Sequence, residues 1–129
     1  MVWYILAALL LLLVQGGLTG SLLTRQVGTA DQMGPRDALP EPTVELGRAR
    51  RALANLQETL PIFLTLGVLL VVYGIDWWLV HLGGALYVAG RVAHLVFYMK
   101  GLTPWRSIAF GVSMLGIFSL AAALVVGIP

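Results

Sequence analysis

Apolar residues along the chain form four long runs, separated by shorter polar stretches. A helix needs about 20 mostly apolar residues to cross the hydrocarbon core of a bilayer. The second run is the shortest, and we expect its helix to begin in the more polar sequence that precedes Leu60. The pattern therefore predicts an all-α membrane bundle with helices at about residues 2–23, 44–74, 77–99 and 105–128.

The sequence from 24 to 43 is polar and interrupts this pattern. It contains Pro35, Pro40 and Pro42 together with glycine and charged residues. Clusters of proline, glycine and polar residues are typical of loops. We expect a loop over 24–43 and short connections near 74–76 and 99–104.

The composition supports a single integral membrane domain. Hydrophobic residues make up 59% of the 129 residues and charged residues 11%, whereas soluble domains have about 25% charged residues. The absence of cysteine excludes disulfides, thiolate metal sites and a cysteine nucleophile. A net charge of +2 is too small to indicate a nucleic-acid partner.

Basic residues predict the orientation, because cytoplasmic loops of membrane proteins are rich in lysine and arginine. The sequence between the first two spans carries five arginines, and the connection after the third carries Lys100 and Arg106. The connection at 74–76 has only Asp76. We therefore expect both basic connections in the cytoplasm and both termini on the other side, as in a bacterial inner-membrane protein. No basic residue precedes Arg25, which argues against a cleaved signal peptide.

Polar side chains within the second and third spans recur at helical spacing. Residues three, four and seven positions apart share one face of a helix. A charged side chain at bilayer depth costs at least ~2.5 kcal/mol and usually faces the interior of the bundle. The two rows are Arg51, Asn55 and Glu58 on the second helix, and Tyr87, Arg91, His94 and Tyr98 on the third.

The two rows also match in depth. Helices joined near residues 74 and 75 bring together positions whose numbers add up to about 149, as Glu58 and Arg91 do. We expect these two residues to form an ion pair, because neither tolerates burial alone. The rows either hold the two helices together or line a polar cavity, and spacing alone favours a cavity for a polar ligand.

The fourth span begins with Pro104, and proline suits the first turn of a helix. Free backbone N–H groups at a helix start attract anions, and Arg106 adds a full positive charge. This end of the helix would hold either a lipid phosphate or an anionic group of a substrate.

These residues resemble the MAPEG family, the membrane-associated proteins in eicosanoid and glutathione metabolism. The similar stretches are Arg51-Ala-Leu-Ala-Asn55-Leu-Gln-Glu58, then Arg91-Val-Ala-His94 with Tyr98, and Arg106-Ser107. They look closest to the microsomal prostaglandin E synthase branch. The resemblance covers roughly residue 48 to the C-terminus, while the first span is similar only in being hydrophobic.

The resemblance implies a homotrimer of four-helix protomers that binds glutathione in a cytoplasm-facing cleft between subunits. It implies catalytic roles for Arg106, which would stabilise the thiolate, and for Ser107. The implied glutathione-binding residues are Arg51, Asn55, Glu58, Arg91, His94 and Tyr98. The function expected is that of a glutathione-dependent transferase or peroxidase acting on a lipophilic substrate that reaches it from the bilayer.

The chain departs from the family at Phe110, where some members have a tyrosine, and at Thr59, which replaces an aromatic residue of the leukotriene branch. An accessory membrane subunit that keeps the fold for packing and binds another membrane protein remains the alternative. A shared metal is not expected, because His81 and His94 lie about 20 Å apart along one helix. A small multidrug transporter is disfavoured because the first span lacks a glutamate.

Overall fold

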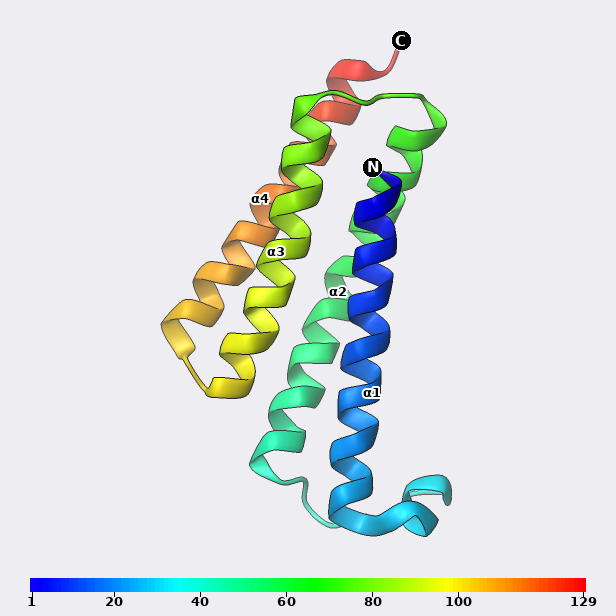
Figure 1. Cartoon of the computed structure of the whole chain (residues 1–129), viewed down its shortest axis with the longest axis vertical. Helices are drawn as coiled ribbons and strands as arrows, with labels where there is room; N and C mark the ends of the chain where they lie inside the picture. Colours follow the sequence, from blue (N-terminus) through cyan, green and yellow to red (C-terminus); the bar gives the residue numbers. More distant parts are fainter.

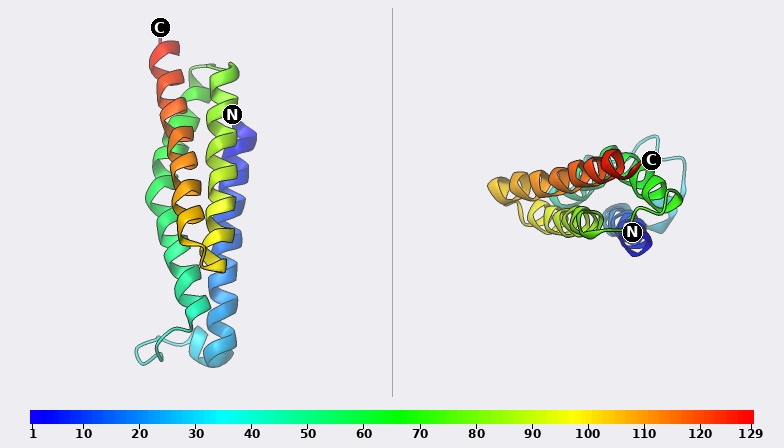
Figure 2. Two further views of the ribbon diagram at one scale, coloured as in Figure 1. Left: turned by 90° about the vertical axis from the view of Figure 1, so that its left-hand side faces the viewer. Right: turned by 90° about the horizontal axis from the view of Figure 1, so that it is seen from above.

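Four α-helices make up the fold, and the structure, a computed structural model, describes residues 1–129. The helices run alternately up and down beside one another, so that both termini lie at the same end (Figures 1 and 2). Each is long and apolar enough to cross a membrane. The predicted all-α, four-span architecture is confirmed. The helices are α1 (Val2–Met33), α2 (Val44–Val72), α3 (Trp78–Lys100) and α4 (Thr103–Gly127).

The predicted loop at 24–43 is wrong in its first ten residues, because α1 continues to Met33. No proline occurs before Pro35, and a polar helix outside the hydrocarbon core loses nothing by staying helical. Gly28, with φ of 84°, bends the last turns of the helix sideways (Figure 1). The end of the loop proper is held against α1, where the Gln26 amide donates to the carbonyl oxygen of Glu41 at 2.6 Å.

Local signals in the sequence fix the ends of the other helices. The Thr43 hydroxyl caps α2 by accepting from the Leu46 N–H at 3.2 Å. Gly101 ends α3 in the left-handed conformation with φ of 72°, and the Leu102 N–H reaches back to the Phe97 carbonyl at 2.9 Å. Pro104 lies in the first turn of α4, as expected.

The closest helix packing joins α3 and α4. A β-carbon at Gly116 would lie 2.6 Å from the Tyr87 nitrogen, and one at Gly90 would lie 2.8 Å from the Ser113 nitrogen. Small residues of this kind let membrane helices approach closely without a hydrophobic driving force. This contact sets the rotation of α3, and with it the direction in which the polar row of α3 points.

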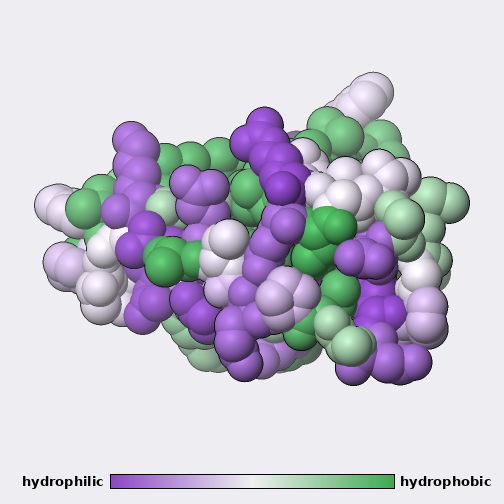
Figure 3. Space-filling view, turned by 90° about the horizontal axis from the view of Figure 1, so that it is seen from below, coloured by the Kyte–Doolittle hydropathy of each residue, from purple (hydrophilic) through white to green (hydrophobic).

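Arginine and lysine side chains gather at one end of the bundle, which carries Arg25, Arg48 and Lys100 and which we call the basic end. Seen from this end, the surface is largely hydrophilic (Figure 3). α1 and α2 extend further here than α3 and α4 (Figure 1). The α3–α4 connection therefore lies beside α2 rather than beyond it, within reach of the arginines of α2.

Candidate functional site

Arg91 lies at the centre of a buried polar network between α2 and α3. Its side chain is 1% exposed. Nη1 donates to Asn55 Oδ1 at 2.6 Å, and Nη2 donates to Thr59 Oγ1 at 2.6 Å. The Thr59 hydroxyl also shares a hydrogen bond of 3.1 Å with the Tyr87 hydroxyl. The network is closed by Phe63, whose ring stacks on Tyr87 at 3.9 Å between centroids.

The prediction that Glu58 and Arg91 form an ion pair is wrong. Glu58 is exposed and forms no salt bridge, and the one contact of this kind joins His81 Nε2 to Asp76 Oδ1 at 3.0 Å at the opposite end. Successive residues of a helix are turned by about 100°, so Glu58 points about 60° away from Asn55. Arg91 faces the stripe of α2 that carries amide and hydroxyl groups instead. The guanidinium is therefore buried without an acidic partner in the protomer, and its Nε has no hydrogen-bond partner.

Tyr98 lies between two arginines nearer the basic end. The Arg106 guanidinium carbon is 4.6 Å from the centroid of the Tyr98 ring, and that of Arg51 is 6.0 Å away. The His94 ring meets Tyr98 edge-on at 5.4 Å. The contact between Arg51 and Tyr98, whose numbers add up to 149, agrees with the predicted depth match between α2 and α3.

Two adjoining hollows open around Tyr98 and Arg106, which line both. The larger, of about 270 Å³, is lined by Asn55, His94, Tyr98, Arg106, Ser107 and Phe110. The smaller, of about 160 Å³, is lined by Arg48, Arg51, Phe97, Tyr98, Gly101, Leu102, Thr103 and Arg106. The structure thus brings six of the eight predicted site residues directly into the hollows and places Arg91 behind them through its bond to Asn55.

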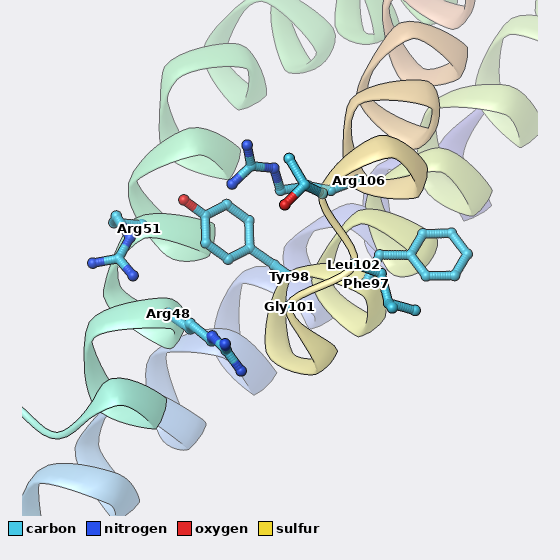
Figure 4. A pocket seen from close by; sticks show the side chains of 8 residues that line it. Arg48, Arg51, Phe97, Tyr98, Gly101, Leu102 and Arg106 are labelled. Atoms are coloured by element: carbon cyan, nitrogen blue, oxygen red, sulfur yellow. The ribbon is translucent and has the colours of Figure 1, made fainter.

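The smaller hollow has three arginines and no acidic residue in its lining. Figure 4 shows the side chains of Arg48 and Arg51 reaching it from α2, while Arg106 comes from α4 across the Tyr98 ring. Such an arrangement suits a ligand with carboxylate groups, because guanidinium groups bind carboxylates through charge-assisted hydrogen bonds.

Ser107 lines the larger hollow, and its hydroxyl donates to the Thr103 carbonyl at 3.4 Å. The bond is long, so the hydroxyl remains able to turn towards a ligand. Glu58 lines neither hollow. No group of three or more His, Asp or Glu side chains is placed to hold a metal ion.

Sequence reasoning missed two residues of this region. Arg48 Nη1 donates to the Met99 carbonyl at 3.1 Å, which ties α2 to the end of α3. Thr59 is the second partner of Arg91. Helical spacing could have identified both residues. Arg48 lies three residues before Arg51 and Thr59 lies four residues after Asn55, so both share the polar side of α2.

The model of the MAPEG family matches residues 1–126. The chain belongs to the MAPEG family. The match includes α1, whereas the resemblance noted in the sequence began at about residue 48. No curated protein and no solved structure matches the chain.

Membership gives the two hollows a chemical context, because MAPEG proteins are often glutathione-dependent transferases or peroxidases. Glutathione has two carboxylates, one amino group and one thiol. The smaller hollow has three guanidinium groups in its lining, and the exposed carboxylate of Glu58 lies on the neighbouring face of α2.

Proposed function

We propose that this MAPEG protein is a membrane-bound enzyme that activates the thiol of glutathione. The enzyme then either transfers glutathione to a lipophilic substrate or uses the thiol to reduce that substrate. One observation carries the proposal. Arg106 and Tyr98 form the common wall of an arginine-rich hollow and of a second hollow lined by amide, imidazole and hydroxyl groups.

The carboxylates of glutathione would bind in the arginine-rich hollow, with Arg51 as a principal partner. Asn55 and His94 would contact the peptide from the wall of the larger hollow. Arg91 would act from behind, since it holds the Asn55 carbonyl oxygen at 2.6 Å and so leaves the amide N–H₂ group free to donate to the ligand.

The thiol would lie beside Arg106 and Ser107, at the start of α4. A free cysteine thiol has a pKa of about 8.5, and a nearby cation or helix N-terminus lowers it. Arg106 lies in the first turn of α4 and supplies the cation. The thiol proton would leave to water, and the Ser107 hydroxyl would donate a hydrogen bond to the resulting thiolate. In a transfer reaction the thiolate attacks the electrophilic carbon of the substrate, and the bond from that carbon to the leaving group breaks. In a peroxidase reaction the thiolate attacks one oxygen of a hydroperoxide, the O–O bond breaks to release an alcohol, and a second glutathione converts the sulfenic acid to the disulfide and water.

Exposed Glu58 supports a cleft between subunits. A carboxylate facing hydrocarbon is unfavourable, so it requires a polar neighbour that one protomer does not supply. The amino group of glutathione together with an adjacent protomer would meet this need. We therefore propose a homotrimer with the cleft open to the cytoplasm and both termini on the other side.

The alternative, a non-catalytic accessory subunit that binds another membrane protein, has one observation in its favour. The network around Arg91 is largely satisfied within the protomer, as it would be if it served only to join α2 and α3. Arg51 and Arg106 of the smaller hollow form no side-chain hydrogen bond within the protomer, so they are not needed for that purpose, and they favour the enzyme.

Calorimetry of glutathione binding to the purified protein in detergent tests the proposal. Arg106→Ala and Glu58→Ala should each weaken binding by about 10- to 100-fold, the loss typical of one charge-assisted hydrogen bond. Arg50→Ala is the matched control, because Arg50 is exposed on α2 and lines neither hollow. A folded wild-type protein that binds no glutathione would refute the enzyme and favour the accessory subunit.

A further inference from the structure

An apolar trough runs along α3 and α4 and shares Phe97 with the lining of the arginine-rich hollow. It has a volume of about 340 Å³. Figure 4 shows the Phe97 side chain pointing away from the arginines. The lining residues are Ala89, Gly90, Ala93 and Phe97 of α3 and Trp105, Ile108, Ala109 and Val112 of α4.

The trough follows from the close packing of α3 and α4. Gly90 and Ala109 meet at its floor, where a β-carbon at Gly90 would lie 2.9 Å from the Ala109 carbonyl oxygen. Phe97 and Trp105 form its rim near the basic end, with ring centroids 6.2 Å apart. Trp105 is 55% exposed. An indole in this position is typical of the membrane interface, where its apolar ring and its N–H group meet different surroundings.

A cationic residue follows the trough at the end of α3. Ala89, Ala93 and Phe97 lie four residues apart on one face of α3, and Lys100 follows on the same face at the end of the helix. Lys100 is exposed and forms no ion pair. No acidic residue follows Asp76 in the chain, so nothing on α3 or α4 at this end neutralises the lysine.

We propose that the trough binds one anionic phospholipid, with its phosphate at Lys100 and the Trp105 indole N–H and one acyl chain along the small residues of the floor. Charge complementarity selects this occupant over a neutral lipid. A second copy of the chain would have to bury Lys100 without an acidic partner from α3 or α4. The proposal does not depend on glutathione binding.

Quenching of Trp105 fluorescence by brominated lipids tests the proposal. The variant Trp3→Phe/Trp77→Phe/Trp78→Phe keeps Trp105 as the single tryptophan. The variant is reconstituted in vesicles of phosphatidylcholine with increasing fractions of phosphatidylglycerol, with either lipid brominated. Brominated phosphatidylglycerol should compete for the site about fivefold better than brominated phosphatidylcholine, the factor that one lysine near an anionic headgroup contributes.

Two further substitutions separate the site from general surface charge. Lys100→Gln should abolish the preference, whereas Arg50→Gln, which removes an exposed charge from α2 at the same end, should leave it unchanged. Ala93→Phe fills the trough and should also reduce the preference, because the acyl chain loses its place while the lysine remains. Soluble glycerol phosphate should not compete, since it has no acyl chain.

Equal quenching by both lipids would overturn the proposal, and so would a preference that survives Lys100→Gln or Ala93→Phe. Quenching by neither lipid would show that another copy of the chain covers the trough, which is equally incompatible with a lipid site. Size-exclusion chromatography and circular dichroism of each variant establish that it is folded before the comparison is made.

Discussion

Replacing Thr59 by valine removes one hydroxyl group from the buried network and leaves a side chain of similar shape. The hydroxyl accepts the hydrogen bond from Arg91 Nη2 at 2.6 Å and shares the bond of 3.1 Å with Tyr87. Both bonds are lost in the variant. Because Arg91 is 1% exposed, no water replaces the missing acceptor.

The expected loss follows from these two bonds. Hydrogen bonds to charged groups contribute about 1.5–3 kcal/mol in soluble proteins. Those between membrane helices average about 0.6 kcal/mol and reach about 1.7 kcal/mol, because the unfolded chain in a membrane also finds partners. Taking the upper membrane value for the bond to Arg91 and the average for the bond to Tyr87 gives about 2 kcal/mol. This corresponds to about 30-fold in the folding equilibrium constant.

Reversible unfolding in mixed micelles of a mild and a denaturing detergent, followed by circular dichroism, measures this difference. Thr65→Val on the same helix is the matched control, since the Thr65 hydroxyl is exposed and donates only to the Pro61 carbonyl. A double-mutant cycle with Tyr87→Phe then isolates the bond between the two hydroxyl groups. Equal losses for Thr59→Val and Thr65→Val would show that the network contributes nothing to stability.

Two other substitutions test the packing around the site. Gly116→Leu should force α3 and α4 apart and lower the free energy of unfolding by about 2–3 kcal/mol. Gly111→Leu is the control, because no atom lies within 4 Å of its new β-carbon, and it should leave the unfolding curve nearly unchanged. Arg48→Ala should remove the bond between α2 and the last turn of α3, so hydrogen exchange of the α3–α4 connection should become about tenfold faster, the factor for a loss of about 1.4 kcal/mol. Unchanged exchange, or a Gly111 variant as unstable as the Gly116 variant, would contradict this account of how the site is held.

Particular residues show how far sequence reasoning reached. The depth match of α2 and α3 follows from a constant rise per residue and a short connection, and Arg51 does meet Tyr98. The prediction that Arg91 pairs with Glu58 was wrong. Helical spacing shows which residues share a face of a helix, but it does not show which residues of the neighbouring helix that face contacts. Thr59 was noted only as a departure from a family pattern, and it proved to be one of the two groups that hold Arg91.

The sequence by itself determined the four helices, their membrane-spanning length and the depth of each polar residue. These properties depend on apolar run length and on helix geometry, both of which are local. Only the tertiary structure decided the rotation of each helix, because rotation results from contacts between residues far apart in the chain, such as Gly116 against Tyr87. That rotation turns Arg91 towards Asn55 and Thr59, leaves Glu58 exposed, and brings Arg48 to the end of α3.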